Sequence, residues 1–200
     1  MHRTLTLISL TALASFHEVT AQNHGSFDGF KLVDKTGNVT KPPDYRDKYE
    51  MLGSWTVLDP KGNQMHSVYA SPGTAEYYRR NKTFADGTIL VKEIHGTATG
   101  QMTTGNVDWA TDPPQVWFVM IKDAKGRFPN NPLWGNGWGW ALFKANAPDK
   151  QVATDFKKDC LGCHVPQKRT IGFTSRAIPL SIPSEKVTIS SSTRPRGAVI

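Results

Sequence analysis

Cys160-Leu161-Gly162-Cys163-His164 stands near the C-terminal end of a chain of 200 residues. Cys-x-x-Cys-His is the attachment signature of a c-type haem. Thiols at this spacing on a helical turn lie on one face, where both can reach the same porphyrin. The histidine that follows is then placed to bind the iron as an axial ligand. The stretch therefore predicts a covalent haem on Cys160 and Cys163, with His164 as the iron ligand.

A structural zinc site and a redox disulfide are the alternatives for these cysteines. Zinc takes about four closely placed ligands, and the sequence has neither a second cysteine pair nor a His-x3-His run. A redox Cys-x-x-Cys normally follows a strand of a βαβ unit, and no such pattern precedes Cys160. The chain has 2 cysteines, so haem attachment leaves none for a disulfide.

Residues 1–21 have the features of an export signal peptide. His2 and Arg3 form a short charged region, Leu5 to Phe16 is apolar, and Val19-Thr20-Ala21 offers a small-residue cleavage site. The apolar run is too short and too often interrupted by Ser and Thr to span a bilayer. A buried N-terminal helix is the alternative. Export predicts a periplasmic protein, which agrees with haem attachment because bacterial cytochromes c receive their haem outside the cytoplasm.

The positive charge of the chain does not indicate a nucleic-acid surface. The net charge is +7, but much of the excess lies in residues 171–200. Elsewhere Lys and Arg alternate with Asp and Glu, as on an ordinary solvated face. A mature chain of this length fits one domain with its own core.

The middle of the chain has the pattern of a β-rich domain with a few helices. Residues 22–43 are polar and contain glycine and a Pro-Pro pair, which predicts a tether. Asp44 is expected to cap a helix that runs to Leu52, and Thr74 to cap one that runs to Asn81. Turn sequences rich in Asp, Gly and Pro separate the expected strands. These strands are Trp55 to Leu58, Met65 to Ala70, Thr88 to His95, Gln115 to Lys122 and Trp138 to Lys144.

A haem protein can carry electrons, bind a gas or perform chemistry, and the sixth iron ligand decides which. A Met or His there closes the site, whereas an apolar pocket admits a substrate. Methionine in a strand more often fills the core, so the sequence does not rank the candidates. They are Met51, Met65, Met102, Met120, His66 and His95.

Several short stretches occur in the order found in one known family. They are Tyr45-Arg46-Asp47, Val68-Tyr69 with Pro72-Gly73, Phe84 to Glu93, Gly137-Trp138-Gly139-Trp140, and Lys158 to His164. On these residues the chain resembles the cytochrome P-460 family, whose members include hydroxylamine-oxidising cytochromes and the gas-binding cytochromes c′-beta. The resemblance covers residues 44–170, and the Asp-Gly-Thr-x-x-x-Lys-Glu run is its most specific part.

The resemblance implies a mono-haem antiparallel β-sheet domain that forms a homodimer. The expected fold class is therefore α+β and β-rich, with a few helices and a c-type haem near the C-terminus. His164 would bind the iron on the proximal side and leave the distal side open. Hydroxylamine would bind there and lose electrons to an external acceptor, which makes the chain a hydroxylamine oxidase. The alternative is a cytochrome that binds nitric oxide or transfers electrons, without catalysis.

In the hydroxylamine-oxidising members, a lysine in the strand after Asp-Gly-Thr is joined to a haem meso-carbon, and Lys92 occupies that position. Strand alternation places Lys92 on one face with Leu90 and Ile94, and Glu93 on the other. Burial would lower the pKa of the Lys92 ammonium and leave a nucleophilic amine. A lysine that extends past its aliphatic neighbours to water is the alternative.

Aromatic side chains on or beside the strands are candidates for lining the haem, although ordinary core packing explains them as well. They are Phe84, Phe118, Trp138 and Trp140. Glu93 should point away from Lys92, so the pattern does not favour it as a catalytic base. Asp108 and Asp112, expected in a loop after Val107, are weaker candidates.

Residues 171–200 diverge from the family after Thr170. Relatives continue with an aromatic segment similar to Asp-Trp-Val-Tyr, whereas this chain has a tail rich in Ser, Pro and Arg. Moving the reading frame back by one base lets the codons from Ile171 onward encode such a segment. We therefore hypothesise a frameshift near Thr170 and expect Ser181 to Ile200 to pack poorly; a divergent tail is the alternative. Resequencing that finds a restoring base supports the hypothesis, and a clean read without one counts against a sequencing error.

Overall fold

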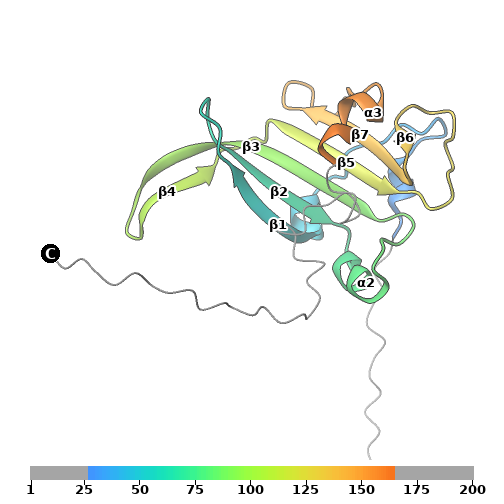
Figure 1. Ribbon diagram of the computed structural model, residues 1–200, viewed down its shortest axis with the longest axis horizontal. Helices are drawn as coiled ribbons and strands as arrows, with labels where there is room; N and C mark the ends of the chain where they lie inside the picture. Colours follow the sequence, from blue (N-terminus) through green and yellow to red (C-terminus); the bar gives the residue numbers. More distant parts are fainter. Residues whose placement is uncertain (1–26, 165–200) are drawn as a thin grey trace, which may run out of the picture.

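The computed structural model describes residues 27–164. Its centre is an antiparallel sheet of 7 strands in the order β1-β2-β3-β5-β7-β6, with β4 paired to the far part of β3 (Figure 1). The strands are β1 Glu50–Val57, β2 Gln64–Ala70, β3 Ile89–Met102, β4 Gly105–Ala110, β5 Val116–Lys122, β6 Trp134–Gly135 and β7 Trp138–Lys144. The expected β-rich, antiparallel fold class is confirmed. The export signal over residues 1–21 and the tail over residues 171–200 lie outside the described residues.

Short helices lie around the sheet. They are a 3-10 helix Gly29–Leu32, then α1 Tyr45–Lys48, α2 Thr74–Asn81, α3 Phe156–Asp159 and α4 Leu161–His164. Figure 1 shows α3 above β5 and β7 on one side of the sheet, and α2 at one end of it. In the part of the chain that the structure describes, no helix has the length and apolar character needed to cross a membrane.

Side-chain alternation divides the sheet into two differently covered faces. We call the face under α3 and α4 the motif face; Leu90, Met120 and Trp140 pack there with α2, α3 and Phe84. The opposite face is the rear face. Its buried residues include Val91, Val119, Ile121 and Phe143, and the N-terminal segment and α1 pack against them. Because both faces are covered, the central strands β3 and β5 have long apolar runs.

The segment expected to be a tether packs against the rear face from Phe30 onward. Val39 is buried, and Phe30, Leu32 and Val33 contact the same core. These apolar side chains are spaced among polar ones without a helical or strand period, so the sequence pattern alone did not reveal their burial.

The expected helix from Asp44 to Leu52 is wrong in length. Asp44 adopts a left-handed backbone conformation (φ 51°) and makes no side-chain cap. α1 ends at Lys48, because Tyr49 already has extended backbone angles. β1 begins at Glu50, and Leu52 reaches the core of the motif face from this strand. By contrast, the second expected helix is present as α2 and ends at Asn81 as predicted. Thr74 is its first residue and not its cap, because Gly73 occupies the N-cap position in a left-handed conformation.

Strand β3 continues beyond the expected end at His95 and forms a two-stranded ribbon with β4. Figure 1 shows this ribbon projecting beyond the rest of the sheet. Gly105 has a φ of +123° at the turn, a conformation that glycine adopts readily. Met102 and Trp109 are exposed on the ribbon (52% and 42%). The sequence did not predict the ribbon because Gly and Thr dominate the pattern there and few apolar residues alternate.

A buried carboxylate on β3 organises the rear face. Glu93 is 3% exposed and accepts hydrogen bonds from the hydroxyls of Tyr45 and Tyr69. It also pairs with Arg46 Nε at 2.9 Å and His95 Nε2 at 3.0 Å. Burial alone would raise the pKa of Glu93, but hydrogen bonds from Tyr45, His95 and Arg46 together lower it. The charged carboxylate therefore ties α1 to the centre of the sheet.

Replacing this carboxylate should destabilise the fold. We expect Glu93→Gln to lower the free energy of unfolding by about 3 kcal/mol, because it leaves Arg46 without its buried partner. Urea unfolding of the purified protein measures the loss. Asp112→Asn is the matched control, since Asp112 also pairs with Arg46 but is 70% exposed; it should cost less than about 1 kcal/mol. Equal losses in the two variants would contradict a central role for Glu93.

Candidate functional site

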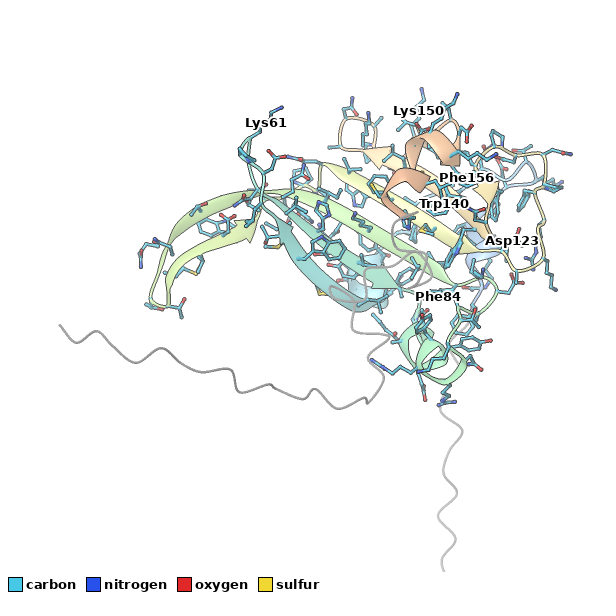
Figure 2. All side chains as sticks on the ribbon, in the orientation of Figure 1. Lys61, Phe84, Asp123, Trp140, Lys150 and Phe156 are labelled. Carbon is cyan, nitrogen blue, oxygen red and sulfur yellow. The ribbon has the colours of Figure 1, made fainter. Side chains whose placement is uncertain are left out.

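The segment that carries Cys160 is docked on the motif face through one aromatic residue. The Asp155 carboxylate caps α3 by accepting a hydrogen bond from the Lys157 backbone N–H at 2.8 Å. Phe156 then stacks on Trp140, with ring centroids 5.9 Å apart and an interplanar angle of 16°. Figure 2 shows these two side chains next to each other beneath the helix. The N–H of Phe156 also donates to the Pro132 carbonyl at 3.0 Å.

Gly135 makes room for this docking. A Cβ built at Gly135 would overlap the ring of Phe156, so only glycine allows the ring to lie directly on β6. The Trp140 indole N–H donates to the Gly135 carbonyl at 3.2 Å. This close contact holds the first residue of α3 on the sheet, and Cys160 follows directly after the helix.

The structure brings the predicted haem-binding residues together at the junction of α3 and α4. Both cysteines are free thiols; Cys160 is buried and Cys163 is exposed. Burial raises the pKa of the Cys160 thiol to about 11, with smaller effects of Asp159 and Cys163 in the same direction. The His164 ring packs edge-on against Trp140, with centroids 4.9 Å apart. The motif thus lies over the aromatic part of the motif face.

Lys92 projects from β3 onto this same face. In the strand register it lies between Val68 of β2 and Phe118 of β5. Its Nζ is 5.5 Å from the ring centroid of Trp55 and 5.7 Å from that of Phe118. Burial lowers the pKa of Lys92, while the electrostatic effect of Cys163 opposes that shift. The amine is therefore held by aromatic rings, on the same side of the sheet as the Cys-x-x-Cys-His motif.

His66 on β2 is a second ionisable group on the motif face. His66 lies opposite Ile94 of β3 in the strand register and is therefore the diagonal neighbour of Lys92. The ring centroids of His66 and Trp55 are 5.4 Å apart. The side chain is buried, and burial lowers the pKa of His66 to about 4, helped by the charge of Lys92. Its Nδ1 has no hydrogen-bond partner among the described residues.

The register separates the candidates for a sixth iron ligand. Met120 and His66 lie on the motif face. Met51 and Met102 are exposed, and His95 binds Glu93 on the rear face, where Met65 is its cross-strand neighbour. Of the six candidates, Met120 and His66 are therefore the ones on the same face as the Cys-x-x-Cys-His motif.

The structure also places the weaker candidates. The aromatic residues Phe84, Trp138 and Trp140 are buried in the core of the motif face, and Phe118 is half-buried beside Lys92. Asp108 lies in β4 and not in a loop; it accepts a hydrogen bond from Asn63 at 2.9 Å. Asp112 pairs with Arg46 at 3.1 Å. The sequence analysis did not identify Trp55 as a residue of the site, because only the register of β1 on β2 brings its ring to Lys92.

These residues fit a covalently bound haem. Two free thiols and an adjacent histidine lie beside an aromatic and apolar surface, which is the environment that a porphyrin requires. The unpartnered Nδ1 of His66 provides a polar atom on the same surface. Within residues 27–164, no group of three or more His, Cys, Asp and Glu side chains is arranged to hold a bare metal ion.

Comparison with known proteins agrees with this fit. The family model described as Cytochrome P460 matches residues 42–171. That range contains Lys92, Cys160, Cys163 and His164. No curated protein matches the chain.

Filling the space at Gly135 should impair haem attachment. In Gly135→Ala the new methyl group displaces Phe156, at a cost of about 1–3 kcal/mol. The cysteines then sample positions away from the motif face, and we expect a smaller fraction of exported protein to carry covalent haem. The ratio of haem to protein absorbance in denatured samples measures that fraction. Gly162→Ala is the matched control because an added Cβ there meets nothing within 4 Å; equal haem loss in both variants would contradict the docking role of Gly135.

Proposed function

The chain belongs to the cytochrome P460 family, and from this we propose that it is a periplasmic mono-haem c-type cytochrome that oxidises hydroxylamine. Membership implies a haem cofactor with iron. In the proposal, Cys160 and Cys163 hold the haem through thioether bonds, and His164 binds its iron on the proximal side. The distal side stays open to small nitrogen compounds. The proposed location rests on the export features of residues 1–21.

The position of Lys92 is the observation that carries the proposal. Its amine is half-buried on the face that receives the motif, and Trp55 and Phe118 flank it. Burial lowers the pKa of Lys92, which favours the uncharged, nucleophilic form. Such a lysine is suited to bonding with the edge of a porphyrin. The bond would remove one N–H hydrogen, one ring C–H hydrogen and two electrons, which an oxidant of the peroxide class accepts.

The protein side chains have distinct roles in the proposed oxidation. The haem supplies the site at which a small nitrogen compound binds and from which its electrons leave to an external acceptor. Trp55 and Phe118 keep water away from Lys92 and hold its amine in place. The stacked pair Phe156 and Trp140 fixes the segment that bears the haem against the sheet.

A cytochrome that binds nitric oxide or transfers electrons is the second candidate. The apolar and aromatic character of the motif face favours it, since such a pocket admits a small gas without chemistry. The two candidates differ in the covalent state of Lys92. If the Lys92 amine forms no bond to the porphyrin, the haem keeps the electronic structure of an ordinary c-type haem.

The proposed assembly is a homodimer, and the β3–β4 ribbon supplies its contact surface. Two strands alone are not stable in water, yet this ribbon projects beyond the sheet and exposes Met102 and Trp109. A second copy packed on the ribbon would bury both. Trp109→Ser should shift the protein from dimer to monomer in light scattering, whereas Leu58→Ser, which alters another exposed apolar residue, should not. A monomeric wild-type protein would contradict the assembly.

Substitution of Lys92 should separate the two candidate functions. We expect a tryptic digest of the wild-type protein to lack cleavage after Lys92 and to give its peptide attached to the haem peptide containing Cys160 and Cys163. Lys92→Arg keeps the positive charge but cannot act as a nucleophile, because the guanidinium stays protonated. The variant should retain covalent haem, show a Soret band without the red shift of the wild type, and lose hydroxylamine-dependent reduction of a dye.

Lys122→Arg is the matched control for this experiment. Lys122 also lies on the motif face, with its Nζ 5.1 Å from the ring centroid of Trp138. The control variant should keep the wild-type spectrum and activity. A free peptide ending at Lys92, recovered from fully haem-loaded wild-type protein, would exclude the cross-link and favour the gas-binding cytochrome.

A further inference from the structure

The motif face contains a buried polar atom that the fold does not satisfy. Within the described residues, the buried side-chain N and O atoms without a partner are His66 Nδ1 and Thr88 Oγ1. An unpaired polar atom in a dry environment is costly, so native proteins seldom retain one without a use. His66 is 8% exposed and lies on the ligand side of the sheet, next to Trp55 and diagonal to Lys92.

The tautomer of His66 follows from its one hydrogen bond. In the orientation present, Nε2–H donates to Gln64 Oε1 at 3.3 Å. Nδ1 then carries the lone pair and can only accept a proton. Gln64 therefore fixes which ring nitrogen carries the proton, as outer hydrogen bonds commonly do for functional histidines.

The one carboxylate at the described strand positions of the motif face is Glu50, which pairs with Ala70 at the start of β1. Its oxygens accept hydrogen bonds from the backbone N–H groups of Gly73 and Ala75, so it is already engaged at the start of α2. From β2 to β7, the strand positions that point to the motif face include His66, Val68 and Ala70 in β2, Leu90, Lys92 and Ile94 in β3, Val116, Phe118, Met120 and Lys122 in β5, and Trp138 and Trp140 in β7. None of these residues is an Asp or Glu. Glu93 and His95 are directed to the rear face, where they bind each other.

We propose that His66 Nδ1 is the proton acceptor for a small nitrogen ligand that carries N–H or O–H groups, of the hydroxylamine class. This role rests on the function proposed above. The proton passes from the ligand to the Nδ1 lone pair and gives an imidazolium, while the electron pair of the broken bond stays on the ligand. The ligand loses its electrons to the external acceptor already required by the oxidation.

Lys92 is the charged group that acts on His66 in the described structure. Burial, and to a smaller extent the Lys92 charge, keep the pKa of His66 near 4, so the ring is neutral at neutral pH. Bonding Lys92 to the porphyrin would remove that charge. The pKa of His66 would then rise by the smaller, Lys92 part of its shift, while burial would still lower it; the cross-link is thereby coupled to the strength of the base.

The experiment compares His66→Phe and His66→Asn in the haem-loaded, full-length protein. Phe keeps a ring but removes both nitrogens, and Asn keeps an acceptor near Nδ1 that cannot be protonated. We expect hydroxylamine-dependent dye reduction to fall by about 100-fold or more in both variants, as for loss of a general base. Nitric oxide has no proton to give, so its affinity should change by less than about 2-fold, well below the range of a lost base.

A spectroscopic readout tests the position of His66 without turnover. Carbon monoxide bound to the ferrous protein should show a C–O stretching band that changes as the pH falls from 8 toward 4 and His66 becomes a hydrogen-bond donor. The change should be absent in both His66 variants. His95→Asn is the matched control: it alters a histidine on the rear face, so thermal stability should fall while the band keeps its pH dependence.

Two results would overturn the role of His66. One is a wild-type carbon monoxide band that does not depend on pH, or the same dependence in His66→Phe. The other is a His66→Phe variant that still oxidises hydroxylamine, or that loses nitric oxide binding to the same extent. A wild-type protein with covalent haem that does not oxidise hydroxylamine contradicts the proposed function instead. In that case the carbon monoxide band still decides whether His66 faces the ligand.

Discussion

Neighbouring residues of a β-strand must point to opposite faces, and this constraint on Lys92 and Glu93 organises the molecule. Glu93 enters the rear face, where donors from α1 and β2 and from His95 surround its carboxylate. Lys92 enters the motif face, where aromatic rings flank its amine. A shift of the register by one residue would bury the carboxylate among aromatic rings and place the ammonium beside Arg46. The two ionisable side chains therefore help to specify how β3 pairs with β2 and β5.

Packing against the sheet holds the Cys-x-x-Cys-His motif in place, because the hydrogen bonds within its own short helix cannot do so. A helix as short as α4 is not stable alone, so its position follows from Phe156 on Trp140 and Gly135. The residues of this contact come from β6, β7 and α3, which are close in the sequence. Lys92 and Trp55 come from earlier strands, so the complete site forms only when both halves of the sheet have paired.

The charges of the motif face suit a proton-coupled oxidation. Next to one another on this face are the Lys92 amine and the His66 imidazole, and burial lowers the pKa of both; the strand positions of this face from β2 to β7 include no carboxylate. Of these two groups, the imidazole of His66 is neutral at neutral pH and can act as a base in an apolar surrounding. The Glu93 carboxylate is kept behind the sheet, where it stabilises the fold and cannot pair with either group. The stabilising carboxylate and the candidate reactive groups can lie on opposite faces of β3 because each face has its own buried core.

The sequence by itself determined the haem motif, the strand that carries Lys92 and the face that Lys92 shares with Leu90, because these follow from local spacing and alternation. It also predicted α2 and the bounds of β7. It failed at α1, where the backbone of Asp44 overrode the expected cap, and at β4, where glycine and threonine hide the strand pattern. Only the tertiary structure brought Trp55 and the unpartnered nitrogen of His66 to Lys92. Local alternation decides the direction of a side chain, but its neighbours across the sheet depend on strand register, which long-range pairing sets.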